Sequence, residues 1–529
     1  SRGKIRKLDL GTKQASVIPF HVKDTRTVSK AVRSPIDPAP AEVQTKMIRW
    51  PQVTPDGKRV VFQALGHIYV RDLPRDGSPI GEPKRLTNDK EFEHFPSLSR
   101  DGKFVVYAAW DDENLGSIRV VPVGGGASRT ITKQPGHYVD PVFTPDGKHV
   151  VFGKVSGGYL TSPLWSRDTG VYRVDLEGGD PVLVTKKGTR PRFGASSERV
   201  FLTDYAFDKE ADNAKLISMK LDGTEERTHY KSTWATEYEV SPDGKWIAFV
   251  ERFNVYITPF VDTGRTIDVG PDTKALPIAK ATKEAGTYIH FGADSKSLTW
   301  TLGPELFTRS LTDCFAFLEG APEKLPEPPA TGTNIGFTVA HDTPKGTVAF
   351  VGAKILTMRN DGQEIIENGV VVVEGNRITM VGPLASTTYP ADAFTVDCTG
   401  MTITPGFIDA HAHGGLGTNE IIPQQNWGQY SNLAFGVTTI HDPSNDTSTF
   451  FAASEMQKAG LIVAPRLFST GTILYGATGS FKAEINSLDD ALFHLKRMQA
   501  VGAFSVKSYN QPRRDQRQQV IQAAHELGM

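Results

Sequence analysis

The chain has 529 residues, more than one hydrophobic core usually spans, so about two or three domains are expected. Its 59 basic and 60 acidic residues give a net charge of −1, which offers no reason to expect a nucleic acid or an anionic membrane as a partner. Cys314 and Cys398 are the two cysteines, which excludes a disulfide framework and a cysteine-based zinc knuckle. No apolar run approaches the roughly 18 residues that a membrane span requires.

A short turn followed by an apolar strand recurs six times between residues 46 and 333. The turns are centred on Asp56, Asp101, Asp146, Ser196, Asp243 and Asp294, of which the copies at Ser196 and Asp294 are degenerate. The steps of 45 to 51 residues are typical of a four-stranded propeller blade. Proline presets φ, aspartate bonds its own following backbone and glycine accepts a positive φ, so these positions are interpreted as structural turns and not as catalytic residues.

The repeats resemble those of TolB-like, WD40-like β-propellers, with a second strand such as His67–Val70 and a blade end such as Pro83–Thr87. The resemblance implies an all-β propeller over residues 1–345, closed by residues 335–339, with a surface for protein or peptide contact. Residues 1–45 would be the tail of an earlier blade, because Ile5, Leu8 and Leu10 predict a strand at the very start. A secretion signal upstream of residue 1 is compatible with this, and a periplasmic or secreted location is suggested by analogy alone.

The pattern changes after residue 345, where short strands are predicted at Val348–Val351, Gly369–Val373 and Arg377–Val381. The last two are joined by the turn Glu374–Asn376. We therefore expect a small β-domain over residues 346–402.

Two histidines spaced by one residue end the apolar segment Thr404–His413. On a strand, residues i and i+2 point to the same face, so His411 and His413 could converge on one metal ion. Pro405-Gly406 before the segment and Gly414-Gly415 after it suggest a strand that enters and leaves through loops. The alternative is a solvated histidine pair on a turn.

The segment Pro405–His413 closely resembles the opening metal motif of the amidohydrolase superfamily, and Gly352–Leu356 matches the start of the small β-sandwich that precedes it there. The resemblance implies a sandwich over 346–402 and, over 403–529, the first half of a (β/α)8 TIM barrel. It also implies a divalent metal, with zinc as the expected ion and one or two ions bound by His411 and His413. The remaining ligands would lie beyond Met529, so the chain is expected to be a fragment with an incomplete metal shell.

Alternating strands and helices are predicted after His413, with strands starting near residues 403, 437, 466 and 503. One helix is expected over Thr449–Lys458, and a second is expected to be capped by Ser487 with Asp490. The second helix would bury Leu488, Leu492, Leu495 and Met498. A last helix is expected from about Arg513 to Leu527, followed by Gly528.

Lys507 lies within the predicted fourth strand, Ala503–Tyr509, where alternation places Ser505 and Lys507 on one face. The resemblance implies that a lysine here is carboxylated to a carbamate that bridges two metals. Burial in an apolar strand would lower the pKa of the amine, which favours reaction with carbon dioxide. The alternative is an ordinary lysine at the mouth of a loop.

Further polar residues stand at predicted strand ends, where barrel enzymes build their active sites. Asp409 shares the face of His411 and is a candidate to orient it. The candidates for substrate binding are His441, Tyr509 and Arg513, and an arginine there could hold a substrate carboxylate. Weaker candidates are Asp442, Thr470 and Arg514.

The resemblance implies a metal-dependent hydrolase that cleaves C–N bonds of a non-peptide amide, a cyclic amide or a dipeptide-like substrate with a metal-activated water. The expected partner is a small-molecule or peptide-like substrate. The alternative is a propeller-based scaffold for peptides or proteins with an inactive barrel. A serine peptidase would need a Gly-x-Ser-x-Gly elbow, which the 529 residues do not contain.

Overall fold

The computed structural model describes residues 4–25, 36–74, 78–157, 167–207 and 212–529. The chain divides into two compact units, residues 1–35 and 36–529. The described part of the first unit is an antiparallel hairpin of β1 (Ile5–Leu8) and β2 (Ala15–Ile18). The predicted N-terminal strand is therefore present, and among the described residues its sheet partner is β2.

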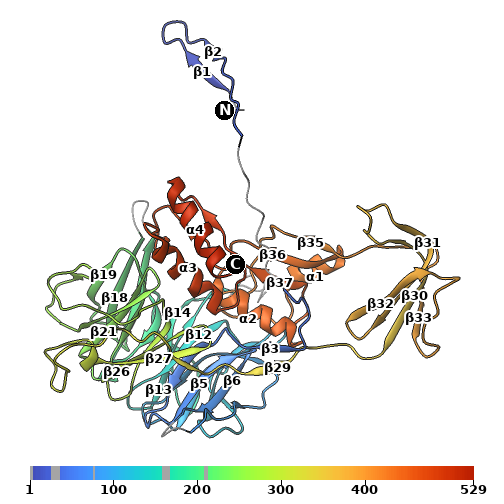
Figure 1. Ribbon diagram of the computed structural model, residues 1–529. Helices are drawn as coiled ribbons and strands as arrows, with labels where there is room; N and C mark the ends of the chain where they lie inside the picture. Colours follow the sequence, from blue (N-terminus) through green and yellow to red (C-terminus); the bar gives the residue numbers. More distant parts are fainter. Residues whose placement is uncertain (1–3, 26–35, 75–77, 158–166, 208–211) are drawn as a thin grey trace. The chain divides into compact units, whose positions relative to one another are not determined.

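Six antiparallel sheets of four strands follow one another along the described part of residues 49–334 (Figure 1). Their strands, sheet by sheet, are β4 (Arg49–Val53), β5 (Arg59–Ala64), β6 (His67–Asp72) and β7 (Lys84–Arg85); β8 (Phe92–Leu98), β9 (Phe104–Asp111), β10 (Leu115–Pro122) and β11 (Arg129–Thr130); β12 (Tyr138–Phe143), β13 (His149–Lys154), β14 (Gly170–Asp175) and β15 (Val182–Thr185); β16 (Thr189–Arg192), β17 (Arg199–Phe207), β18 (Asp212–Lys220) and β19 (Arg227–Ser232); β20 (Ala235–Val240), β21 (Trp246–Glu251), β22 (Asn254–Pro259) and β24 (Ala279–Lys280); β25 (Thr287–Phe291), β26 (Ser297–Leu302), β27 (Glu305–Ser310) and β28 (Thr333–Asn334). A short β23 (Ile267–Asp268) adds to the fourth sheet beside β19, and the 3-10 helix η1 (Leu311–Asp313) follows β27.

The first strands of these sheets contact one another in a ring. β4 contacts β8, β8 contacts β12 and β12 contacts β16, while β20 contacts β17, β18 and β25. β25 in turn contacts β4, which closes the ring of a six-bladed β-propeller. The two ends of this region are tied where β29 (Thr338–Ala340) pairs with β3 (Glu42–Gln44), close to the segment predicted to close the propeller.

The Asp-Gly turns of the repeats are held by their own side chains. Asp56 Oδ1 accepts hydrogen bonds from Thr54 Oγ1 at 2.6 Å and from Lys58 N at 3.0 Å, and Gly57 has φ of 65°. The same pair of bonds recurs at Asp101, Asp146 and Asp243. In the degenerate copies, Ser196 and Asp294 each accept from the backbone N–H two residues on. The structural interpretation of these positions is confirmed.

A separate sheet follows the propeller and contains the predicted strands of the small β-domain (Figure 1). β31 (Ile365–Glu374) pairs antiparallel with β30 (Thr347–Leu356) and with β32 (Arg377–Pro383), and the turn between β31 and β32 carries Gly375 at φ 58°. β33 (Phe394–Asp397) and β34 (Thr402–Ile403) run parallel to β30. The strand predicted to start near residue 403 thus belongs to this sheet.

Parallel strands and helices alternate in residues 407–526. β35 (Phe407–Asp409), β36 (Val437–Asp442) and β37 (Arg466–Ser469) form a three-stranded parallel sheet, and β38 (Leu474–Tyr475) pairs in parallel with β39 (Ser508–Tyr509). The helices are α1 (Trp427–Ala434), α2 (Thr447–Lys458), α3 (Leu488–Ala500) and α4 (Arg514–Glu526). No barrel is closed within the described residues.

The helix signals in the sequence are confirmed with small shifts. Ser487 and Asp490 form the expected capping box of α3. α2 begins at Thr447, two residues before the predicted start, because the Asp446 side chain caps it by accepting from Thr449 N. Gly528 follows α4 with φ of 68°, as its predicted helix-ending role requires.

The fourth predicted strand, Ala503–Tyr509, is wrong in its extent, because only Ser508–Tyr509 are paired. β37 ends at Ser469 and Gly471 turns the chain with φ of 63°, so the neighbouring backbone becomes available for pairing again only at Leu474. Leu474 N donates to Lys507 O at 2.9 Å, which marks the start of that pairing.

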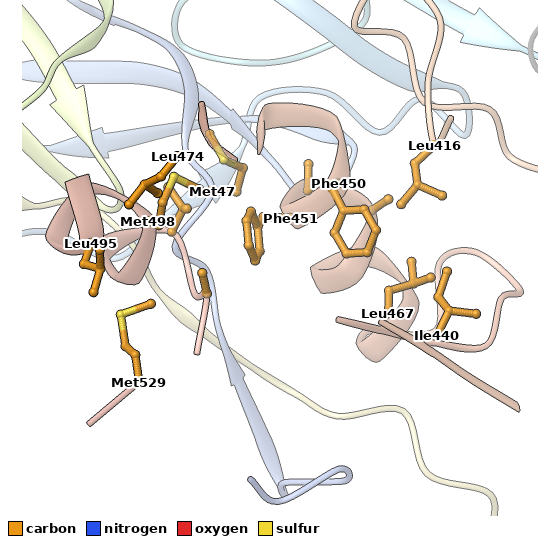
Figure 2. Packing of buried hydrophobic residues seen from close by; sticks show 14 of the residues in the cluster. Met47, Leu416, Ile440, Phe450, Phe451, Leu467, Leu474, Leu495, Met498 and Met529 are labelled. Atoms are coloured by element: carbon orange, nitrogen blue, oxygen red, sulfur yellow. The ribbon is translucent and has the colours of Figure 1, made fainter. Parts of the chain in front are cut away.

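The apolar core of the strand–helix region centres on α2 (Figure 2). Phe450 is fully buried and lies toward Ile440 and Leu467 of the parallel sheet, whereas Phe451 lies toward Met498 and Met47. Met47 directly precedes the first blade, so this core includes a residue of the propeller segment. Each such ring contributes about 1.5–3 kcal/mol through its burial.

Candidate functional site

His411 and His413 lie in the loop that follows β35, which ends at Asp409. The prediction that they stand on the strand itself is therefore wrong, because His411 and His413 lie two and four residues beyond its end. Their rings nevertheless converge, with centroids 5.1 Å apart and an interplanar angle of 59°. Both residues are exposed, so the imidazoles are open to a ligand.

Asp442, at the end of β36, lies beside His413. Its Oδ1 is 3.4 Å from His413 Nδ1, and only 1% of the aspartate side chain is exposed. Ser444 N and Asn445 Nδ2 donate to the two carboxylate oxygens at 2.8 and 2.7 Å, which fixes the carboxylate in place. A carboxylate beside Nδ1 favours the tautomer that leaves Nε2 free as a metal ligand.

Asp409 was predicted to orient His411, and the structure gives it a different contact. Its Oδ1 accepts a hydrogen bond from the backbone nitrogen of His411 at 3.0 Å. Asp409 therefore holds the loop that carries the histidine, whereas the carboxylate beside an imidazole is that of Asp442.

His441 precedes Asp442 on β36 and is already engaged. Its Nε2 lies 2.7 Å from Ser505 Oγ, and burial lowers the pKa of its imidazole, a shift that a hydrogen bond to the Ala410 backbone opposes. A neutral ring held in this way can donate or accept one fixed hydrogen bond at the site. Ser505 was named in the sequence only as a neighbour of Lys507, and no local signal pointed to its contact with His441.

Lys507 is half-buried and lies outside any strand, so the premise of a lysine within an apolar strand is wrong. Its Nζ lies 5.0 Å from the ring centroid of Tyr509, as a cation over an aromatic face. Lys507 lies outside a strand because β39 begins only at Ser508, which leaves Ala503–Val506 unpaired as well.

Tyr509 and Arg513 differ in their relation to the histidines. The Tyr509 ring stacks on Tyr475, which lines a cavity together with His413, at 5.9 Å and 16°. Arg513 pairs with Asp515 at 3.2 Å and reaches Asn486 at 3.4 Å, and none of these three residues lines that cavity. The weaker candidates do not line it either, since Thr470 is buried against Gly471 O and Arg514 is exposed on α4.

The cavity at His413 is built from the loops that follow the parallel strands. Its lining residues are His413, Gly414, Gly415, Ser444, Asn445, Asp446, Thr472, Ile473, Tyr475 and Phe481. These loops stand at the carboxyl ends of β35, β36 and β37, which is where α/β sheets bind their ligands.

The two imidazoles fit part of a zinc shell. Zinc accepts imidazole nitrogen, and catalytic zinc sites generally use three protein ligands. Within the described residues, no three His, Cys, Asp or Glu side chains form a group that could hold a metal ion. His411 and His413 would therefore supply two ligands of an incomplete set, with Asp442 orienting one of them.

No family model matches the chain. The imidazolonepropionase of Erwinia tasmaniensis is 34% identical over 118 residues, which are 22% of this chain and 28% of that protein. The imidazolonepropionase of Sphingopyxis alaskensis is 30% identical over 135 residues, which are 24% of this chain and 33% of that protein. The chain thus spans about a third or less of the length of these relatives.

Solved structures similar to the chain include a TolB and a prolidase. TolB from Acinetobacter baumannii has a TM-score of 0.32 at 19% identity, over 48% of this chain and 56% of that one. A putative prolidase from Bifidobacterium longum has a TM-score of 0.30 at 24% identity, over 35% of this chain and 48% of that one.

None of the helices in the described ranges is both long and apolar enough to cross a bilayer.

Proposed function

We propose that the chain carries part of a metal-dependent hydrolase of the amidohydrolase type, which cleaves C–N bonds of an amide, a cyclic amide or a dipeptide-like substrate. The observation that carries the proposal is the convergence of the His411 and His413 rings in the loop after the first of three parallel strands. The partial similarity to imidazolonepropionases supports it. The half-barrel arrangement of residues 403–529 is part of the same proposal.

The chain's own residues would prepare the site in three ways. Asp442 lies beside Nδ1 of His413 and so leaves Nε2 available, and Asp409 fixes the backbone of His411. His441, held by Ser505 and by the Ala410 backbone, would fix the backbone beside the two histidines; its predicted role as a substrate contact stays a proposal. A bound divalent ion, with zinc as the expected species, would supply a water of lowered pKa and polarise a carbonyl.

We also propose that Lys507 forms a carbamate that bridges two metals and that Tyr509 contacts the substrate. Carboxylation would join the Lys507 amine nitrogen to the carbon of carbon dioxide and release one proton. Carbon-13 labelling of the metal-loaded protein tests it. A carbamate resonance that disappears in Lys507→Ala supports the role, and an amine without label contradicts it.

The experiment for the function measures the zinc that the chain binds, because an incomplete set of metal ligands in the described residues is not expected to support hydrolysis. We expect zinc to bind to the chain and the double variant His411→Ala/His413→Ala to lose it, while His525→Ala on the exposed face of α4 keeps it. Unchanged zinc content in the double variant would contradict the proposal.

The alternative is a propeller-based scaffold for peptides or proteins. It is favoured by the absence of a group of three metal-ligating side chains in the described ranges. A chain that binds peptides but takes up no zinc at any concentration would support the scaffold.

A further inference from the structure

The inner strands of the propeller carry an unusual backbone feature at matching places. Non-glycine residues with positive φ occur at Trp50 (48°), Phe95 (54°), Asp140 (50°), Arg190 (54°) and Tyr288 (54°), one in each of five sheets. Each lies where the register of its strand shifts against its neighbour. Such residues cost about 1 kcal/mol or more each and concentrate at ligand clamps. The same backbone conformation therefore recurs at the same place in five of the six sheets.

Four of these five residues, all except Phe95, line a cavity in the propeller. Trp50, Asp140 and Tyr288 line it together with Arg190 and Glu237. Glu420, from the loop between β35 and α1, lines the same cavity. The cavity therefore combines aromatic rings with partly buried groups of both charges.

Two arginines hold Glu420: Arg190 lines this cavity, and Arg49 does not line it but bonds the same carboxylate. Arg190 donates from Nη2 to Glu420 Oε1 at 3.4 Å, and its Nη1 lies 3.7 Å from Glu237 Oε2. The side chain of Arg49 is fully buried and donates from Nη2 to Glu420 at 3.3 Å, while its Nε and Nη1 have no hydrogen-bond partner among the described residues. A buried guanidinium with unpaired N–H groups is costly unless a ligand completes it.

Glu420 can leave these arginines without undocking its loop. Its backbone oxygen accepts from Arg49 Nη2 at 2.7 Å, and Ile422 N donates to His94 Nε2 at 3.4 Å. Gln425 N donates to Asp112 Oδ2 at 2.6 Å. The loop is thus anchored by its backbone, and the Glu420 carboxylate is free to exchange with another carboxylate at unchanged net charge.

This cavity adjoins the one at His413. Asp446 and Phe481 line both of them. A ligand whose carboxylate occupied the place of Glu420 would extend past these two residues toward His413.

We propose that the propeller cavity at Arg190 binds the carboxylate end of the substrate, which displaces the Glu420 carboxylate from Arg190 and Arg49. The ligand class is an N-acyl amino acid or a short peptide with a free C-terminal carboxylate. The position of the scissile bond near His413 rests on the proposed function, whereas carboxylate binding does not.

The test compares N-acetyl-alanyl-alanine with its C-terminal amide by isothermal titration calorimetry on the full chain. We expect the acid to bind about tenfold tighter than the amide. Arg190→Gln should abolish that preference, and Arg190→Lys should retain part of it. Arg199→Gln, on β17 where Arg199 pairs with Glu225 and does not line the cavity, should leave the preference unchanged. Glu420→Gln should tighten acid binding about threefold or more, because the competing carboxylate is gone.

Equal binding of acid and amide, no binding of either, or an unaltered preference in Arg190→Gln would overturn the proposal. Circular dichroism of each variant checks that it is folded. The double variant His411→Ala/His413→Ala separates the two proposals, because it should keep the preference for the acid. If the double variant loses zinc and keeps its preference for the acid, the two sites are independent. If the native protein binds zinc at the histidines but shows no preference for the acid, the carboxylate proposal alone is wrong.

Discussion

Glu455 of α2 is a buried carboxyl group that should make the stability of the protein depend on pH. Its Oε1 accepts from Lys46 N at 2.7 Å and Met47 N at 3.0 Å, and its Oε2 has no hydrogen-bond partner in the described part of the chain. Burial raises the pKa of this carboxyl from 4.5 to about 7, against the opposing effect of the two backbone donors. Glu455 is 6% exposed, so solvent screening is small.

The sign follows from proton binding. Between pH 4.5 and about 7 the folded state keeps the proton on Glu455 while the unfolded state has released it. Rising pH therefore removes stability from the native protein across this window. A shift of about 2.5 pKa units corresponds to about 3 kcal/mol, which is the upper bound of the effect.

Glu455→Gln removes the titration and keeps an amide oxygen to accept from Lys46 and Met47. We expect the variant to match the native protein near pH 4.5 and to exceed its free energy of unfolding by up to about 3 kcal/mol near pH 8. Urea unfolding followed by tryptophan fluorescence at several pH values measures this difference. Glu526→Gln, exposed on α4, is the control. A difference between variant and native protein that stays constant with pH would refute the reasoning.

Three other measurements, two on variants and one on the native protein, test the strand–helix region. Gly406→Ala places a Cβ against Thr438 Oγ1 and should lower the free energy of unfolding in urea by about 1–3 kcal/mol. Adding Thr438→Ala should recover part of the loss, and an unaffected unfolding midpoint in Gly406→Ala would contradict the packing. Ser487→Ala removes the cap of α3 and should cost about 1 kcal/mol, whereas Ser487→Asp should cost less; equal losses would argue against the cap. NMR titration should give His441 a pKa below the usual value of 6.5. The unfolded state then takes up a proton first as the pH falls through 6.5, so the folded protein loses stability there. A titration of this ring at its usual pKa would contradict the prediction.

The parts of the fold that depend on neighbouring residues were predictable from the sequence. The turns at Asp56 and its equivalents are closed by bonds to residues two positions away, and the cap of α3 lies within three residues. The period of these turns then predicted the propeller, because each blade repeats the same local unit.

The parts that depend on distant residues were not predictable. The predicted extent of the fourth strand was wrong because the pairing of Ser508–Tyr509 depends on where the chain after β37 forms β38. The contact of His441 with Ser505 spans 64 residues, and that of Arg190 with Glu420 spans 230. Neither Ser505 nor Glu420 carries a local pattern that would reveal its partner.

The site itself was predicted in part. His411 and His413 converge as expected, although they lie beyond the strand and not on it. The carboxylate beside an imidazole is that of Asp442, which follows His441 at the end of β36, rather than that of Asp409. Alternation along one strand cannot identify such a residue, because the contact joins the loop after β35 to the end of the neighbouring strand β36.

Anomalous X-ray diffraction from crystals soaked in zinc tests the central claim most directly. The account predicts a zinc peak between His411 Nε2 and His413 Nε2, within about 2.0–2.1 Å of each, and its loss in His411→Ala/His413→Ala crystals. Zinc bound elsewhere, or no peak at these two histidines in the native protein, would contradict it.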